Sequence, residues 1–382
     1  MLQNKRVTRT DVRMRWLGAC ATGFALLWVL LAIWAWTRNF HAVNFTDYIS
    51  YWAAGKLALG GHPADAYDVA VHRATEFTIT RFPGLLPFPY PPPFLLLVTP
   101  FSTVPYMWGF AGFILLTTAI YAVATRRMAD ANYAFAQPAV FINGIIGQNG
   151  FLTAGVFAAG TAMLRERPYV AGAILGTLVI KPQLALLLPV AVIASREWRA
   201  IAGAAVSGGL LLLLALILFG LPAYEGFFRM GPLYTELMRQ DKWPWNEFIS
   251  IFAFVRYFGV GQGIALTVHA VVALGAIALT WIAWAREWPS RVPVLAAATL
   301  LVPPYLLTYD ALLLVVPMGF WTREQRRPWL VALLWFLCVL PIAFYFNFYR
   351  GPNTTPLAAI LALGVFALDR RRTANVDHAD LV

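Results

Sequence analysis

Long apolar runs alternate with short basic islands along most of the chain. The runs are about 15–25 residues long, which is the length that an α-helix needs to cross the hydrocarbon core of a bilayer. No run shows the strict alternation of a half-buried strand, and backbone groups in lipid must be satisfied within the element that carries them. The pattern therefore predicts an all-α membrane protein that crosses the bilayer many times.

The basic islands orient these helices, because positively charged residues gather on the cytoplasmic side. Most of the 29 Lys and Arg residues lie in seven islands, at 5–15, 126–127, 165–167, 196–199, 286–291, 323–327 and 370–372. If all seven are cytoplasmic, the chain crosses an even number of times between islands, about 10–12 times in total. We expect a plasma (inner) membrane protein with both termini cytoplasmic.

This parity divides the chain into tails, spans, loops and hairpins. A single transmembrane domain at 17–369 lies between cytoplasmic tails at 1–16 and 370–382. The run at 17–37 lacks a cleavage pattern and is interpreted as a retained first span. The remaining parts are a first external loop (38–92), a broken helix (93–125), hairpins (133–164, 168–195 and 292–321), a span (200–220), a second external loop (221–262), a returning span (263–285) and two final spans (328–346 and 356–369).

The hairpins are too short to reach across the bilayer. Halves of 13 or 14 residues extend about 20 Å, whereas the hydrocarbon core is about 30 Å thick. Their tips are therefore expected inside the bundle, below the outer surface. The first turn contains Gln148 and Asn149, the second Lys181, and the third Tyr309 and Asp310.

Composition narrows the function classes. The chain has 382 residues, of which 60% are hydrophobic and only 12% charged, against roughly 25% charged in a soluble domain. The net charge of +11 is spread over short islands and forms no stripe that could follow phosphates, which argues against nucleic acid as a partner. Neither metal-ligand spacing nor a nucleotide-binding glycine loop is present. Cys20 and Cys338 lie in apolar runs, and His41, His62 and His72 are interpreted as solvated loop residues.

A helix is predicted at the start of the first external loop. Thr46 is a typical N-cap and Gly60 a typical stop signal. The apolar side chains that share one face between them are Ile49, Trp52, Ala53 and Leu57. We expect this amphipathic helix to lie on the outer membrane surface, with Asp47 in its first turn. There Asp47 either complements the helix dipole or, ionised at neutral pH, serves as a general base.

Lys181 is the most unusual residue, because it interrupts the apolar stretch 170–194. A lysine in mid-bilayer costs at least about 3 kcal/mol. It either binds an anion or extends its ammonium toward water at a hairpin turn. Asp310, beside Tyr309, is expected to pair with Lys181, to orient a substrate hydroxyl or to mark an exposed turn.

The order of several short motifs resembles glycosyltransferase family 87. They are Asp47 in an Asp-Tyr-x-x-Tyr-Trp helix, the entry Tyr90-Pro-Pro-Pro, the turn Gly147-Gln148-Asn149, and the hairpin Gly172…Lys181-Pro182 followed by Arg196-x-Trp198-Arg199. The resemblance covers about residues 20–320 and implies a GT-C bundle. It also implies transfer of a hexose, mannose in known members, from a polyprenyl-phosphate donor to a lipid or glycan acceptor on the non-cytoplasmic face.

The resemblance implies that Asp47 is the general base, and no cofactor beyond the donor substrate is expected. Contacts to the donor phosphate are expected from Lys181 and Arg350, and further substrate contacts from Tyr48, Trp52, Tyr90, Gln148, Asn149, Tyr309 and Asp310. Mycobacterial relatives have a histidine late in the chain, and residues 304–310 contain none, which leaves the sugar and the acceptor open. The alternative function is a lipid or solute transporter with a mid-membrane site around Lys181.

Overall fold

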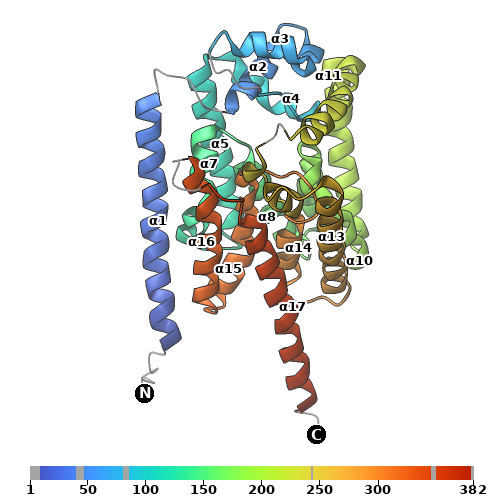
Figure 1. The fold of residues 1–382 in the computed structure, drawn as a ribbon. Helices are drawn as coiled ribbons and strands as arrows, with labels where there is room; N and C mark the ends of the chain where they lie inside the picture. The colour runs from blue at the N-terminus through green and yellow to red at the C-terminus, as the bar shows by residue number, and fades with distance from the viewer. Residues whose placement is uncertain (1–8, 40–46, 81–85, 242–243, 346–349, 380–382) are drawn as a thin grey trace.

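The computed structural model describes residues 9–39, 47–80, 86–241, 244–345 and 350–379 (Figure 1). These residues form 17 α-helices and six short 3₁₀ helices (η), and within them the only strand-like pairing is one isolated antiparallel bridge between Phe248 and Leu307. Four helices are long and apolar enough to cross a membrane, and five further apolar helical segments have 10–17 residues. The prediction of an all-α polytopic membrane protein is confirmed.

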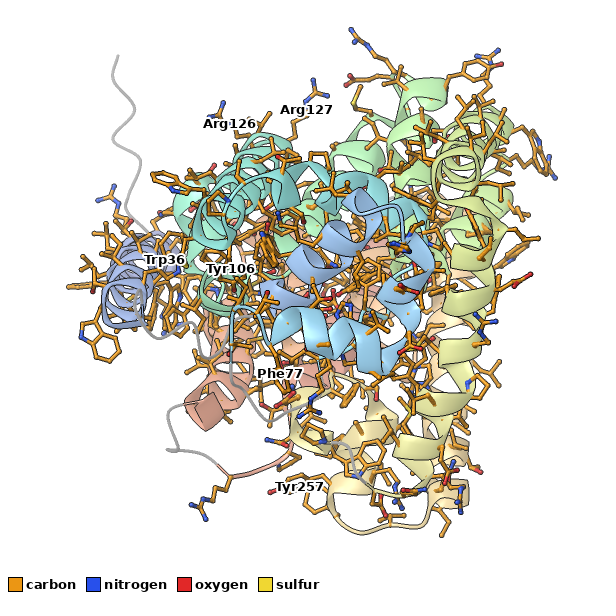
Figure 2. The ribbon with its side chains drawn as sticks, turned by 90° about the horizontal axis from the view of Figure 1, so that it is seen from above. Trp36, Phe77, Tyr106, Arg126, Arg127 and Tyr257 are labelled. Carbon is orange, nitrogen blue, oxygen red and sulfur yellow. The ribbon has the colours of Figure 1, made fainter. Side chains whose placement is uncertain are left out.

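Four long helices frame the bundle. They are α1 (Arg9–Asn39), α5 (Tyr106–Thr125), α11 (Trp198–Arg239) and α13 (Gln262–Ala285). Large apolar side chains cover their outer faces, as a helix in contact with lipid requires. On the inner face of α1, Trp36 packs against Phe110 of α5 at a ring-centroid distance of 5.0 Å, and Figure 2 shows Trp36 on the side of α1 that faces the bundle.

Shorter helices fill the space between the long ones. Those before α11 are α6 (Ala131–Ala136), α7 (Ala139–Ile146), α8 (Gly150–Met163), α9 (Pro168–Gly176), η3 (Thr177–Ile180), η4 (Pro182–Ala185) and α10 (Leu188–Ala194). Those after it are η5 (Trp245–Glu247), α12 (Ile251–Tyr257), α14 (Arg291–Thr299), η6 (Thr308–Leu314), α15 (Val315–Arg323), α16 (Pro328–Tyr345) and α17 (Thr355–Ala379).

Polar contacts join the basic islands at one end of the bundle. Arg127 pairs with Glu166 at 3.6 Å, and Arg165 pairs with Glu287 at 3.2 Å. Arg323 donates to the carbonyl of Arg127 at 2.7 Å. The islands at 126–127, 165–167, 286–291 and 323–327 therefore lie together, away from α2 (Tyr48–Leu59) and α3 (Val69–Glu76), which cap the other end (Figure 1).

The hairpin tips lie inside the bundle, as the length of the hairpin halves predicts. Asn149 is fully buried, Lys181 is 4% exposed and Asp310 is 2% exposed. The interpretation of Asp310 as an exposed turn is therefore wrong. The stretch 93–125 is broken at its prolines as expected, into α4 (Pro93–Val98), η2 (Pro100–Thr103) and α5.

The first-loop helix α2 differs from its prediction. It is not an amphipathic surface helix, because all eight residues from Tyr48 to Gly55 are buried. Tyr51 packs edge-on against Phe94 at 4.9 Å, and Tyr48 packs against Phe110 at 5.5 Å. Tyr48 and Tyr51 lie on the face of α2 that the hydrophobic pattern marks as polar, and their rings make that face buried as well. Asp47 is the N-cap residue, and its side chain makes no capping hydrogen bond.

The next elements of the first loop pack against α2. They are η1 (Pro63–Tyr67) and α3, which the carboxylate of Asp68 caps through the amides of residues 70 and 71. His62 is exposed, but His72 is 2% exposed and lies 3.4 Å from Glu76, so its interpretation as a solvated residue is wrong. His41 lies outside the described residues.

Helix α11 extends into the stretch predicted as the second external loop. It breaks at Gly220, where φ is 74° and ψ is 169°, and continues to Arg239. The Tyr224 hydroxyl donates to the carbonyl of Leu212 at 2.6 Å, twelve residues earlier, so the second half folds back on the first. Gly226 in this second half lies against Tyr67, so closely that a Cβ added at Gly226 would lie 3.0 Å from the Tyr67 Cβ. The second half of α11 therefore packs against η1 of the first external loop.

Candidate functional site

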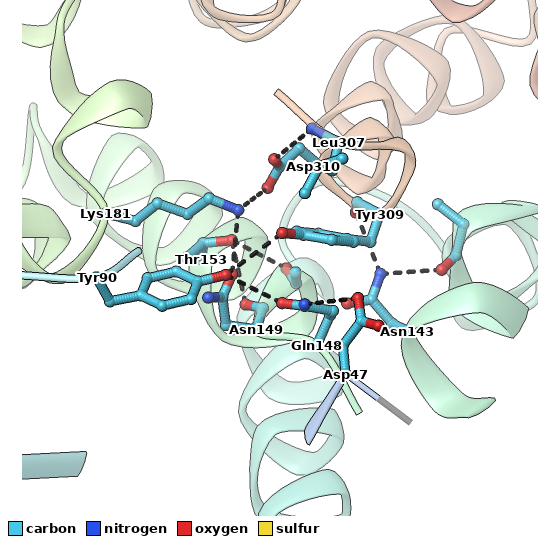
Figure 3. A network of polar contacts seen from close by, with 12 residues as sticks. Asp47, Tyr90, Asn143, Gln148, Asn149, Thr153, Lys181, Leu307, Tyr309 and Asp310 are labelled. Carbon is cyan, nitrogen blue, oxygen red and sulfur yellow. Dashed lines mark hydrogen bonds and ion pairs between the residues drawn. The ribbon is translucent and has the colours of Figure 1, made fainter. Parts of the chain in front are cut away.

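The three hairpin tips meet around the ammonium group of Lys181 (Figure 3). Its Nζ donates to Asp310 Oδ1 at 2.5 Å and to Asn149 Oδ1 at 3.2 Å, and it lies 4.4 Å from the centre of the Tyr309 ring. The other oxygen of Asp310 accepts from the amide of Leu307 at 3.2 Å, which orients the carboxylate toward the lysine. A carboxylate, an amide and an aromatic face thus stabilise a cation in an apolar interior.

Backbone breaks place these side chains. Pro182 disfavours a helical conformation at Lys181, so the chain passes from η3 to η4 through a non-helical residue with φ −146° and ψ 74°. Gly147 has a left-handed φ of 72°, and a Cβ there would lie 2.5 Å from the Tyr48 Cβ. Only glycine permits this close approach, which brings the turn that contains Gln148 against α2.

A chain of amides and tyrosines leads from Lys181 to the first loop (Figure 3). Asn149 Nδ2 donates to the Tyr51 hydroxyl at 3.0 Å, the Tyr51 hydroxyl donates its one proton to Gln148 Oε1, and the hydroxyl oxygens of Tyr51 and Tyr90 lie 2.9 Å apart. Tyr90 also donates to Gln148 Oε1 at 3.1 Å, and its hydroxyl lies 3.3 Å from that of Tyr309. The tips and the first loop therefore share one polar network.

Asp47 forms the other end of this network. Gln148 Nε2 donates to Asp47 Oδ2 at 2.9 Å. Partial burial raises the pKa of the Asp47 carboxyl above its usual range, and the hydrogen bond from Gln148 opposes that rise. Gln148 engages only Oδ2 of Asp47, and Oδ1 has no partner among the described residues. A carboxylate with one free oxygen is suited to accept a proton.

Three sequence-predicted residues lie outside the network. Tyr48 packs among aromatic rings, and its hydroxyl has no hydrogen-bond partner in the described part of the chain. Trp52 donates its indole N–H to the carbonyl of Val104 at 3.2 Å. Arg350 is exposed, and its backbone carbonyl accepts from the Tyr257 hydroxyl. The structure brings together the other seven: Asp47, Tyr90, Gln148, Asn149, Lys181, Tyr309 and Asp310.

Two residues of the site were not anticipated. Tyr51 lies four residues after Asp47, one helical turn later, and this spacing was a signal for it. Glu247 in η5 is half-buried, and burial together with the Asp47 charge raises the pKa of Glu247 to about 7. No sequence spacing indicates this position, because it results from pairing between residues 247–249 and 306–308.

One comparison with known proteins gives a match. The family model described as Glycosyltransferase family 87 matches residues 88–308, more than half of the chain. The matched stretch contains Tyr90, Gln148, Asn149 and Lys181, whereas Asp47 precedes it. No curated protein and no solved structure matches the chain.

Proposed function

We propose that this chain, which belongs to glycosyltransferase family 87 and is therefore a membrane glycosyltransferase, transfers a mannose-like hexose from a polyprenyl-phosphate donor. The acceptor is a lipid or glycan on the non-cytoplasmic face of the plasma membrane, and no cofactor is required. The observation that supports this proposal most directly is the network that joins Asp47 to Lys181. Sugar transfer from a lipid phosphate needs a proton acceptor and a cation near the departing phosphate.

Asp47 is the proposed general base. The acceptor hydroxyl gives its proton to the free Oδ1 while its oxygen forms a bond to C1 of the donor sugar. The bond from C1 to the phosphate oxygen breaks, and the electron pair leaves with the polyprenyl phosphate. Because Gln148 holds Oδ2 at 2.9 Å, the carboxylate keeps one orientation through the step. This single displacement inverts the configuration at C1.

Lys181 is the proposed partner of the donor phosphate. An ammonium group has three N–H donors, and Asn149 and Asp310 engage two of them. The third has no hydrogen-bond acceptor in the part of the chain that the structure describes, and we assign it to a phosphate oxygen. Arg350 is left out of the proposed site because it is exposed and contributes only its backbone carbonyl to a contact.

Membrane orientation follows from the basic islands. The end of the bundle that contains Arg127, Arg165 and Arg323 is proposed to be cytoplasmic. The site then opens toward the opposite leaflet, where Asp47 and the first loop lie. The apolar surfaces of the bundle contact membrane lipid and provide a path for the polyprenyl tail.

The test is sugar transfer by the purified protein in detergent, with polyprenyl-phosphate mannose as donor and octyl mannoside as acceptor. Asp47→Asn is expected to fold and to lose at least about 100-fold in kcat, because a positioned base contributes about 10²–10⁴-fold. Asp65→Asn is the matched control, since Asp65 lies in η1 of the same loop and has no side-chain partner in the described residues. Full activity of Asp47→Asn would refute the role of Asp47.

The same purified protein, reconstituted into vesicles, distinguishes an enzyme from a transporter. A buried lysine at a break between short helices also occurs in transporter sites, and the ion pair of Lys181 and Asp310 fits that alternative. A transporter moves the donor lipid in vesicles and leaves the sugar–phosphate bond intact. Donor movement without release of polyprenyl phosphate would therefore replace the proposed function with transport.

A further inference from the structure

Asn143 of α7 contacts both the first and the third hairpin tips. Its side chain is fully buried, and its Nδ2 donates to the carbonyl of Ala139 at 2.9 Å and to that of Tyr309 at 3.1 Å (Figure 3). On the side of the first tip it faces Gly150, where an added Cβ would lie 2.5 Å from Asn143 Oδ1 and 2.7 Å from the Tyr309 carbonyl oxygen. The Asn143 amide therefore meets both tips, and the absent side chain of Gly150 permits this approach.

Both contacts adjoin the hydrogen-bond acceptors of Lys181. Asn149 directly precedes Gly150 in the first tip. Asp310 directly follows Tyr309 in the third tip. Lys181 Nζ donates to Asn149 Oδ1 at 3.2 Å and to Asp310 Oδ1 at 2.5 Å. One buried amide thus influences where the backbones of both acceptor residues lie relative to each other.

Two other buried amides anchor the third tip. Gln137 Nε2 donates to the carbonyl of Ala311 at 2.8 Å, and Asn353 Nδ2 donates to the Thr308 hydroxyl at 2.9 Å. Both side chains are almost fully buried. Neither bond reaches the first tip, so the contribution that Asn143 adds to these anchors is a link between the tips.

Stability alone accounts poorly for an amide at this position. Asn143 Nδ2 satisfies the Tyr309 carbonyl, but Asn143 Oδ1 is buried and has no hydrogen-bond partner among the described residues. A buried acceptor without a partner has lost its bonds to water and gained none in return. The net stabilisation by the amide is therefore small, and its main effect is on the geometry of the site.

The two acceptors determine where the ammonium group of Lys181 points. An ammonium nitrogen is tetrahedral, so two engaged N–H groups fix the direction of the third. We propose that Asn143 is a positioning residue that holds Asn149 and Asp310 in place and thereby directs the third N–H of Lys181 at the donor phosphate. This inference rests on the proposed function, and in it Asn143 acts through Lys181.

The test is the kinetics of sugar transfer by Asn143→Ala and Asn143→Leu, with polyprenyl-phosphate mannose as donor and octyl mannoside as acceptor. The first variant removes the amide, and the second replaces it with an apolar branched side chain. Each is expected to lose about tenfold or more in kcat, because a misplacement of about 1 Å can cost about 100-fold. The KM values for donor and acceptor should stay within about twofold, since the third N–H acts mainly on the departing phosphate.

Tyr121→Phe is the matched control. The Tyr121 hydroxyl is buried and donates to the carbonyl of Ala134 at 2.9 Å, so this variant also loses one buried hydrogen bond to a backbone carbonyl. That bond joins α5 to α6 and includes no residue of a tip. Tyr121→Phe is therefore expected to lower the melting temperature and to leave kcat unchanged.

A double-mutant cycle separates positioning from a purely structural effect. The background is Lys181→Met/Asp310→Leu, in which the ammonium group is absent. There Asn143→Ala is expected to change kcat by less than about twofold, because no N–H remains for it to direct. Losses in kcat that multiply, as they do for independent sites, would overturn the inference.

The outcomes separate this inference from the proposed function. No transfer by the wild type would refute the proposed function and with it the inference. An active wild type whose kcat is retained in both Asn143→Ala and Asn143→Leu would overturn the inference alone. Unfolding of both variants, with Tyr121→Phe folded, would also overturn it, because it would assign Asn143 to the fold.

Discussion

Replacing the buried ion pair of Lys181 and Asp310, one residue at a time and then together, separates its structural role from its role in transfer. The two charged groups lie 2.5 Å apart and almost fully buried. At an effective dielectric constant of about 20 their mutual attraction is about 7 kcal/mol. Removing both ions from water costs several kcal/mol each, so the net stabilisation by the pair is small.

Breaking the pair is expected to cost far more than deleting it. Lys181→Met leaves the Asp310 charge in an apolar interior, and Asp310→Leu leaves the ammonium there. Each single variant is expected to lose about 3–5 kcal/mol of stability. The double variant Lys181→Met/Asp310→Leu removes both charges, so it should regain most of that loss. The assay is thermal unfolding in detergent, with the four proteins analysed as a double-mutant cycle.

The double variant then isolates the proposed catalytic role. It is expected to fold and yet to lose about 10²–10³-fold in kcat, the usual effect of removing one group that stabilises a developing negative charge. A folded double variant with wild-type kcat would refute the assignment of Lys181 to the donor phosphate. A double variant as unstable as the two single variants combined would refute the electrostatic reasoning, because the cycle would show no coupling.

Three further predictions follow from the geometry. Burial raises the pKa of Asp47 and the proposed base must be ionised, so kcat/KM should fall on the acid side at a higher pH than an ordinary aspartate pKa of about 3.9 suggests. Gln148→Ala should move that fall to still higher pH, because the hydrogen bond from Gln148 lowers the pKa of Asp47. Gly147→Ala places a Cβ at a left-handed φ of 72° and against aromatic side chains. It should reduce the free energy of unfolding by at least about 1–3 kcal/mol, measured as a lower melting temperature and a lower folded yield. In a background without the exposed native cysteine, His62→Cys should react with an impermeant maleimide added outside the cell and Glu166→Cys should not; the reverse pattern would contradict the proposed orientation.

The internal position of the hairpin tips was predictable because it depends only on length. Halves of 13 or 14 residues cannot cross a core of about 30 Å, so a polar tip between two cytoplasmic islands must end inside. The structure buries Asn149, Lys181 and Asp310 as this argument requires. Charge parity likewise depends on counting, and the contacts between Arg127, Glu166 and the neighbouring islands agree with it.

The environment of the first loop was not predictable from its own residues. A hydrophobic pattern treats tyrosine as partly polar, yet Tyr48 and Tyr51 are buried between α2 and the helices that follow. The partner of Asp47 is also non-local, because Gln148 lies 101 residues later in the chain. The helix-dipole interpretation of Asp47 considers only the end of α2, where its side chain makes no capping hydrogen bond, and therefore gives no indication of Gln148.

In the proposed mechanism, the pairing of Lys181 with Asp310 affects catalysis as well as folding. An unpaired lysine at this depth would be costly to insert, and the attraction to Asp310 offsets most of that cost. The donor phosphodiester then meets a neutral pair and gains little from binding near it. As the bond to C1 breaks, the departing phosphate gains a second negative charge, and the ammonium group stabilises that charge more strongly than it stabilises the ground state. Interactions that strengthen toward the transition state accelerate the reaction, so the third N–H of Lys181 is proposed to lower the barrier of the transfer step more than it tightens donor binding.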